Sequence, residues 1–311
     1  MEGVALLRVM MTRIELAQGS PEFSQMAYGT WRMLDGGLTI QDINRRLNRC
    51  VELGITTIDT AEIYGVYEVE KALGEALALS PGLRDQLEIV TKAGIYIPCD
   101  YHPERKVAFY DATAARLKKS LEKSLRFLNT DHLELFLVHR PDWLTSADET
   151  ATGLNQLLAE GKIRSAGVSN YTPSQFQTLN SRMDQPLVTN QVEFHLLYMD
   201  MIYDGTFDQC QELDIKPMAW SPLAGGRIFD ATDETAKRLA ETASGLSEKY
   251  DGASLEQLAY AWIMAHPSKP MPVIGTNKLE RIDSGAQSVN IHLDREDWYA
   301  LWTAAKGHKI P

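Results

Sequence analysis

The sequence predicts an α/β protein, a parallel (β/α)8 TIM barrel preceded by an N-terminal β-hairpin that plugs it. First, eight short apolar segments alternate with helical segments at the roughly 30-residue spacing of a strand–helix repeat. Second, no Gly-x-Gly-x-x-Gly fingerprint follows the first strand, which argues against an open doubly wound sheet. Because the 311 residues show no linker and no break in composition, we expect a single domain over residues 1–311.

The expected strands are short apolar runs bounded by turn residues or helices. A hairpin is expected first, over residues 14–23, because Gly19-Ser20-Pro21 separates two short alternating segments. The barrel strands are expected at residues 26–29, 55–58, 87–91, 133–138, 163–168, 187–190, 216–220 and 271–274.

The expected helices carry apolar residues three and four positions apart. In segment 111–128, for example, Leu117, Leu121, Leu125 and Leu128 share one side. A longer insertion precedes the helix at 254–265. The helices are expected at residues 39–53, 67–79, 111–128, 147–160, 173–180, 204–213, 254–265, 278–287 and 294–305.

The composition argues against several classes of protein. With a formal net charge of −11, the chain is a poor partner for nucleic acid or an anionic membrane surface. Cys50, Cys99 and Cys210 are widely spaced and form no CxxC or Cys/His cluster, so neither disulfides nor a metal site is expected. No convincing cleavage site and no run near the roughly 18 apolar residues of a membrane span is present. We therefore expect a soluble cytoplasmic protein; the sequence indicates no particular oligomeric state.

Polar residues end six of the predicted strands. The second strand ends on Asp59, and Tyr64 follows five residues later, where a helix begins. One such carboxylate is more often a structural group, but the pattern recurs along the chain. The other polar strand ends are Lys92, His139, Asn170, Gln191 and Ser221. Because the carboxyl ends of barrel strands line the active site, we expect these side chains to face one mouth.

The combination of aspartate, tyrosine, lysine and histidine favours proton delivery to a carbonyl oxygen. The set lacks a serine or cysteine nucleophile, a glycosidase carboxylate pair and the ligands of a metal hydrolase. A tyrosine with an ordinary pKa of about 10 becomes a useful acid when an ammonium stabilises its phenolate. Lys92 would supply this ammonium and Asp59 would pair with it. His139 would orient the substrate oxygen by hydrogen bonding.

Several motifs follow one another on successive predicted strands and together resemble the aldo-keto reductases. They are Asp-Thr-Ala-x-x-Tyr-Gly at 59–65, Val-Thr-Lys at 90–92, Leu-Val-His-Arg at 137–140, Gly-Val-Ser-Asn at 167–170, Asn-Gln-Val-Glu at 190–193 and Trp-Ser-Pro-Leu at 220–223. The resemblance implies a barrel that binds NADPH across its mouth and reduces aldehydes or ketones to alcohols. It also implies a catalytic tetrad of Asp59, Tyr64, Lys92 and His139, with Tyr64 as the general acid.

The same resemblance implies the contacts to NADPH. The carboxamide would be bound by Ser169, Asn170 and Gln191, and the nicotinamide would stack on Trp220. The pyrophosphate would be followed by Ser221, Leu223, Gly225 and Arg227. The 2′-phosphate site would be formed by Gly275, Thr276, Asn277 and Arg281. The sequence departs from the family pattern at two places. The preference for NADP over NAD and the contacts to adenine therefore stay open. Gly275 stands where many members have a lysine, and Ser284-Gly285 replaces a common Glu-Asn pair.

Alternative interpretations stay open for several of these residues. His139 and Trp220 could be core residues, and Arg281 could lie on a solvated helix face. Trp31, Trp143 and the segment 95–110 are candidates for the substrate wall, because long loops after barrel strands often carry specificity. A cofactor-binding regulatory or redox-sensing module of the same fold, with little turnover, is the alternative function. The intact tetrad favours the enzyme.

Overall fold

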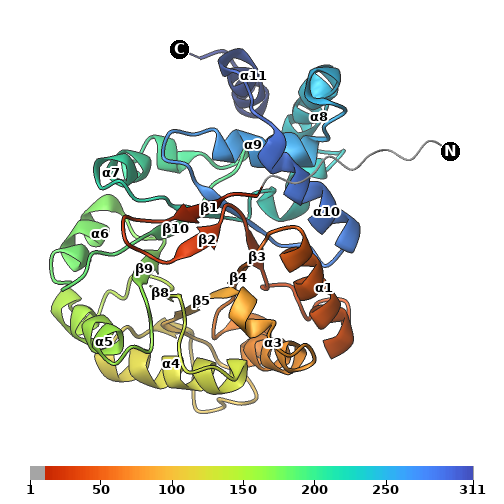
Figure 1. Cartoon of the computed structure of the whole chain (residues 1–311). Coiled ribbons are helices and arrows are strands. Elements are labelled where there is room, and N and C mark those ends of the chain that lie inside the picture. Colours follow the sequence, from red (N-terminus) through yellow and green to blue (C-terminus); the bar gives the residue numbers. More distant parts are fainter. Residues whose placement is uncertain (1–10, 311) are drawn as a thin grey trace.

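The computed structural model of the chain describes residues 11–310, and within them eight parallel strands close into a barrel surrounded by helices (Figure 1). The barrel strands are β3 (Ala27–Gly29), β4 (Thr57–Asp59), β5 (Glu88–Ala93), β8 (Leu135–Val138), β9 (Ala166–Ser169), β10 (Asn190–Glu193), β11 (Met218–Trp220) and β12 (Met271–Ile274). Strand β12 pairs in parallel with β3, which closes the ring. The predicted (β/α)8 fold is confirmed.

The helices alternate with the barrel strands. They are α1 (Ile40–Glu52), α2 (Tyr64–Tyr67), α3 (Val69–Ala78), α4 (Ala114–Leu128), α5 (Ala147–Ala159), α6 (Pro173–Asn180), α7 (Thr206–Glu212), α8 (Glu234–Ser247), α9 (Leu255–Met264), α10 (Leu279–Gln287) and α11 (Arg295–Lys306). Thr39, Thr172 and Ser254 begin α1, α6 and α9 with reciprocal capping hydrogen bonds. Short 3-10 turns lie at Arg84–Gln86, Asp200–Ile202, Ala224–Phe229, Glu248–Tyr250 and Ser288–Asn290.

Three regions differ from the sequence-based expectation. Helix α8 forms where only an insertion was expected, because its buried stripe is narrow and made of Ala236, Leu239 and Ala243. Strands β6 (Ile95–Tyr96) and β7 (Phe109–Tyr110) form a small hairpin in the segment 95–110. Strand β10 begins at Asn190, whereas the expected strand ended there. The buried Asn190 side chain is tolerated because its Oδ1 accepts from the Tyr171 amide and its Nδ2 donates to the Tyr171 carbonyl.

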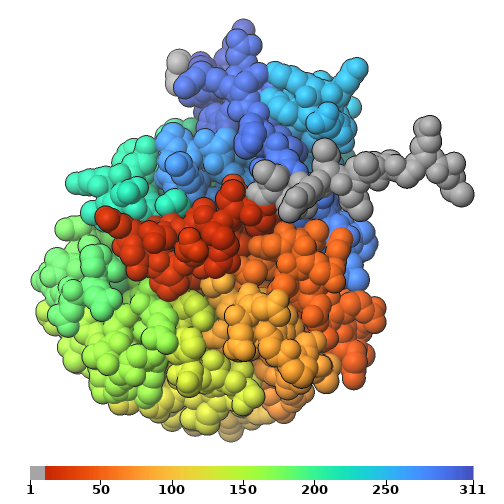
Figure 2. Space-filling model, viewed as in Figure 1, coloured from red at the N-terminus to blue at the C-terminus, as the bar shows by residue number. Residues whose placement is uncertain are grey.

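The N-terminal hairpin, β1 (Arg13–Glu15) and β2 (Glu22–Ser24), is present as predicted and pairs antiparallel. It lies at the end of the barrel where the strands begin, because Ser24 hydrogen-bonds Thr57, the first residue of β4. Figure 2 shows the hairpin crossing this face of the molecule. Its Leu16 and Phe23 are fully buried and pack with residues of the barrel interior such as Leu135. The hairpin therefore closes this end and leaves the carboxyl ends of the strands for a binding site.

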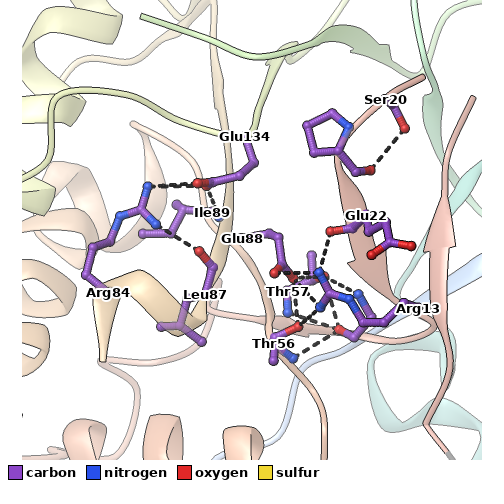
Figure 3. A network of polar contacts seen from close by, with 12 residues as sticks. Arg13, Ser20, Glu22, Thr56, Thr57, Arg84, Leu87, Glu88, Ile89 and Glu134 are labelled. Carbon is purple, nitrogen blue, oxygen red and sulfur yellow. Dashed lines mark hydrogen bonds and ion pairs between the residues drawn. The ribbon is translucent and has the colours of Figure 1, made fainter. Parts of the chain in front are cut away.

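Arg13 ties the hairpin to the barrel (Figure 3). Its guanidinium donates to both carboxylate oxygens of Glu88 at 2.8 and 3.0 Å, and also to Thr56 and the Glu22 carbonyl. We expect Arg13→Ala to lower the free energy of unfolding by about 1–2 kcal/mol, because the half-buried Glu88 loses its cation.

Urea unfolding followed by circular dichroism measures this effect. The control is Arg45→Ala, since Arg45 is largely exposed and its pair with Asp42 is loose at 3.8 Å. We expect the control to change the free energy of unfolding by less than about 0.5 kcal/mol. Equal losses in both variants would contradict a fastening role for Arg13.

A buried carboxyl group links α3 to the barrel and to α4. Glu70 accepts hydrogen bonds from Thr91 at 2.5 Å and Ser124 at 2.8 Å, and only 2% of its surface is exposed. Burial raises the pKa of Glu70 from 4.5 to about 7, against the lowering effect of the two hydroxyl donors. The folded protein therefore holds this proton at a pH where the unfolded chain has released it.

We expect Glu70→Gln to remove a pH dependence of stability. The wild type should lose stability as the pH rises from 4.5 to about 7, because the unfolded chain binds fewer protons in that window. Glutamine keeps the shape and both hydroxyl contacts, so at pH 8 the variant should be more stable by about 1–3 kcal/mol. Unfolding at a series of pH values measures this difference. The control is Glu75→Gln, at an exposed position on the same helix. Its free energy of unfolding should change with pH in the same way as that of the wild type.

Candidate active site

The four residues of the predicted tetrad lie together at the carboxyl ends of the strands. Lys92, in β5, donates from Nζ to Asp59 Oδ2 at 2.7 Å and to Tyr64 Oη at 3.1 Å. The rings of Tyr64 and His139 meet edge to face, with centroids 5.9 Å apart. Asp59 ends β4, and His139 follows β8 directly. The structure therefore brings together groups that are as much as eighty residues apart in the sequence.

A strained turn positions Tyr64. The next three residues, Gly65, Val66 and Tyr67, all have positive φ angles of 56°, 54° and 71°. Non-glycine residues adopt this left-handed region at a cost, so surrounding contacts must hold the turn. Tyr67 supplies them, because its hydroxyl accepts hydrogen bonds from the Ile97 amide at 3.1 Å and from Arg105 at 2.7 Å. The hairpin β6–β7 thus supports the segment that carries Tyr64.

Charge pairing keeps Lys92 protonated. Burial alone would lower the pKa of its fully buried ammonium, but Asp59 and Tyr64 outweigh that effect and the pKa is raised. The Thr60 carbonyl accepts a further hydrogen bond from Nζ at 2.8 Å. The ammonium therefore keeps its charge and uses three acceptors.

The Tyr64 phenol keeps its proton. Burial raises its pKa above the ordinary value of 10.0, although the nearby Lys92 ammonium works in the opposite direction. At neutral pH the group is therefore an un-ionised donor, next to a cation that would stabilise its phenolate.

His139 is neutral in this surrounding. Burial, then the positive charges of Lys92 and Arg140, lower its pKa well below 6.5. Its Nδ1 is buried without a hydrogen-bond partner among the described residues. A neutral imidazole at this place suits hydrogen bonding rather than charge donation.

A chain of hydrogen bonds connects the tetrad to the residues predicted to hold nicotinamide. Gln191 Nε2 donates to Asp59 Oδ1 at 2.7 Å, and the backbone carbonyl of Gln191 accepts from Ser169 Oγ at 2.8 Å. Asn170 Nδ2 donates to the same Ser169 hydroxyl at 2.7 Å, and Trp220 Nε1 donates to Asn170 Oδ1 at 2.9 Å. Asp59 and Trp220 are thereby held in one network across the mouth of the barrel.

The residues predicted for the pyrophosphate follow β11. Ser221 has a positive φ of 51°, and Gly225 in the next turn has one of 65°. Leu223 is buried, whereas Arg227 is exposed. Arg32, in the loop after β3, approaches the Gly225 carbonyl at 3.4 Å. The turn after β11 therefore lies next to the loop after β3, with only β12 between the two strands.

The residues predicted for a 2′-phosphate follow β12, and three of them already make contacts within the protein. Asn277 Nδ2 donates to the carbonyls of Arg32 and Asp35, at 2.6 and 3.0 Å. Arg281 pairs with Glu256 at 3.0 Å. Thr276 caps the next turn by accepting from the Lys278 amide at 3.2 Å. Gly275 is exposed, and no atom lies within 4 Å of the position that a Cβ would occupy.

The two tryptophans predicted for the substrate wall are exposed. Trp31 follows β3 and exposes 57% of its surface, and Trp143 follows β8 and exposes 82%. Trp143 meets Tyr110 edge to face, with ring centroids 5.9 Å apart. Both indoles stand in loops at the carboxyl ends of strands.

Sequence reasoning missed three features of the site. Gln191 contacts the tetrad itself, the Thr60 carbonyl accepts from Lys92, and the Arg140 guanidinium lies 5.9 Å from the centroid of the Trp220 ring. The sequence does contain a signal for two of them, because Gln191 is itself a polar strand end and Arg140 directly follows one. The contacts that Gln191 makes with Asp59, and the Thr60 carbonyl with Lys92, depend on how the strands curve around the barrel.

Comparison with known proteins gives the family. The family model described as the aldo/keto reductase family matches residues 25–305. The chain is 41% identical over 302 residues to oxidoreductase YdhF of Escherichia coli (strain K12), covering 97% of this chain and 100% of that one. It is 42% identical over 303 residues to 6-dehydroglucose reductase of Agrobacterium fabrum (strain C58), covering 96% and 100%. The structure of an aldo-keto reductase from Klebsiella pneumoniae in complex with NADPH superposes with a TM-score of 0.74, at 29% identity over 90% of each chain.

The barrel, the site at its mouth and these matches define an oxidoreductase. The chain belongs to the aldo/keto reductase family. Along residues 11–310, none of the helices combines the length and hydrophobicity needed to span a bilayer.

Proposed function

We propose that the protein is an NADPH-dependent reductase that converts aldehydes or ketones to alcohols, with Tyr64 as the proton donor. One observation carries this proposal: Lys92 Nζ lies within hydrogen-bonding distance of both the Tyr64 hydroxyl and the Asp59 carboxylate. The arrangement suits a phenol that must lose a proton in the transition state. A structural relative in complex with NADPH supports the choice of cofactor.

The residues at the mouth fit the cofactor. Trp220 is half-buried and its indole NH is fixed by Asn170, so it offers a held ring face for a nicotinamide. Gly275 leaves open space beside Thr276, where a phosphate would fit. Ser169, Asn170 and Gln191 would hold the carboxamide; Ser221, Leu223, Gly225 and Arg227 the pyrophosphate; and Gly275, Thr276, Asn277 and Arg281 the 2′-phosphate. When bound, the nicotinamide would supply the hydride that reduces the carbonyl carbon.

The tetrad would then transfer a proton to the substrate oxygen. Tyr64 Oη donates its proton to the carbonyl oxygen, and Lys92 stabilises the phenolate that remains. Asp59 keeps the Lys92 ammonium charged and in place. His139, which stays neutral, orients the substrate oxygen by hydrogen bonding beside the Tyr64 ring.

Loss of NADPH absorbance against a panel of carbonyl compounds tests the proposal. The panel should include sugar aldehydes, because two relatives named 6-dehydroglucose reductase are 42% and 35% identical to this chain. We expect turnover with at least one aldehyde or ketone. Tight NADPH binding without turnover on any carbonyl would instead support a cofactor-binding regulatory module of the same fold.

We further propose that Trp31 and Trp143 form part of the substrate wall. We expect Trp143→Ala to raise the KM for a bulky aldehyde about 5–10-fold and to leave the KM for a small aldehyde within about twofold, since the lost apolar contact is worth about 1 kcal/mol. Steady-state kinetics with a matched pair of aldehydes measures this. Tyr299→Ala, another exposed aromatic residue but on α11, is the control. Equal changes for both aldehydes would contradict a wall at Trp143.

A further inference from the structure

A pocket lies between the β6–β7 hairpin and α4. Its volume is about 530 Å³, which is within the roughly 300–1,000 Å³ of small-molecule sites. Six basic side chains line it, against two carboxylates, Glu62 and Glu104. The basic residues are Arg105, Lys106, Arg116, Lys119, Lys123 and Arg126. In a chain whose net charge is −11, this is a concentration of positive charge against the overall trend.

Much of this charge is unpaired. Four of the cations, at positions 116, 119, 123 and 126, are three and four residues apart and so share one face of α4. Lys106, Lys119 and Arg126 form no ion pair within residues 11–310. Three free cations that share a concave surface suit an anion with several oxygens, such as a phosphate group.

A buried carboxylate in the pocket indicates that the ligand also carries a hydrogen-bond donor. Glu62 lines the pocket and is only 7% exposed, yet its Oε2 has no hydrogen-bond partner among the described residues. Lys123 stays 3.8 Å from Glu62 Oε1, too far for a hydrogen bond, and its Nζ lies 4.6 Å from the Tyr67 ring centroid. Buried polar atoms are nearly always satisfied, so a missing donor is expected here. A hydroxyl group would donate to Oε2 without adding charge.

We propose that this pocket binds a phosphorylated polyhydroxy molecule of the size of a sugar phosphate. The phosphate group pairs with the free cations of α4 and the hairpin, and a ligand hydroxyl donates to Glu62. The pocket shares the segment 95–110 with the expected substrate wall. Its lining includes none of the predicted cofactor residues, which lie on β9 to β11 and in the segments that follow β9, β11 and β12. The proposal does not depend on the carbonyl reductase activity.

Isothermal titration calorimetry with glucose 6-phosphate, inorganic phosphate and glucose tests the proposal, with and without saturating NADP+. We expect glucose 6-phosphate to bind in both conditions, more tightly than phosphate, and glucose alone to show no binding. The variant Lys119→Glu/Arg126→Glu should weaken glucose 6-phosphate binding by at least about tenfold. Both positions are exposed, and an unchanged thermal unfolding midpoint would show that the fold is intact.

The control variant Lys237→Glu/Arg295→Glu carries the same charge change on α8 and α11, at the opposite side of the molecule from α4 (Figure 1). It should bind like the wild type. Glu62→Gln should cancel most of the advantage of glucose 6-phosphate over phosphate, because the charged acceptor for the hydroxyl is gone.

Three results would overturn the proposal as a whole, and a fourth would overturn its polyhydroxy part. The first three are no binding of glucose 6-phosphate by the wild type, equal binding by the Lys119→Glu/Arg126→Glu variant, and loss of all binding when NADP+ is present. Binding of phosphate and glucose 6-phosphate with equal affinity would refute the polyhydroxy ligand.

Discussion

Replacing Tyr64 with phenylalanine should lower kcat for carbonyl reduction by about 10²–10⁴-fold, the usual contribution of a general acid. The change removes one oxygen and keeps the ring, so the edge-to-face contact with His139 remains. Lys92 keeps two of its acceptors, Asp59 and the Thr60 carbonyl. The fold and the affinity for NADPH should therefore change little, and the loss should fall on the proton-transfer step.

Two measurements separate this role from a structural one. Fluorescence titration should show an NADPH Kd within about threefold of the wild type, a change of less than 1 kcal/mol. Tyr28→Phe is the matched control, because the Tyr28 hydroxyl is buried without a partner among the described residues and should be dispensable. Near-normal turnover in Tyr64→Phe would remove the acid role from this residue.

The fold could be predicted because burial leaves a pattern that local sequence carries. Continuous apolar segments such as Leu135–Val138 must be buried on both faces, and they alternate with helices that have one apolar stripe. The pattern was less informative where buried polar groups replace apolar ones. Strand β10 is Asn190–Glu193, and its polar side chains are tolerated because partners elsewhere in the barrel satisfy them.

The site was predictable to the extent that it consists of strand ends. Asp59, Lys92 and His139 each end an apolar segment, and barrel geometry then brings such ends together. The contact between Gln191 and Asp59 joins residues 132 positions apart across the barrel, so no local pattern indicates it. The positive φ angles of Val66 and Tyr67 were equally hidden, because valine and tyrosine do not favour that conformation. Both features depend on tertiary contacts.

Breaking the buried ion pair should have the second large effect. Lys92 is fully buried and Asp59 is 2% exposed, and 2.7 Å separates Nζ from Oδ2. Lys92→Met leaves the Asp59 carboxylate buried with Gln191 as its remaining side-chain donor. An unpaired buried charge costs about 3–5 kcal/mol, so the free energy of unfolding should fall by that amount. Carbonyl reduction should fall at least about 100-fold, because the phenolate of Tyr64 loses its cation.

A double-mutant cycle separates stability from catalysis. In Lys92→Met/Asp59→Asn no charge is left unpaired, and the new amide oxygen still accepts from Gln191. We therefore expect the double variant to regain at least about 2 kcal/mol over Lys92→Met alone, while its turnover stays as low. Urea unfolding and NADPH consumption measure the two quantities. If the stability losses of Lys92→Met and Asp59→Asn simply add in the double variant, the two charges do not stabilise the barrel by neutralising each other. If turnover returns together with stability, the Lys92 ammonium is not required for proton transfer.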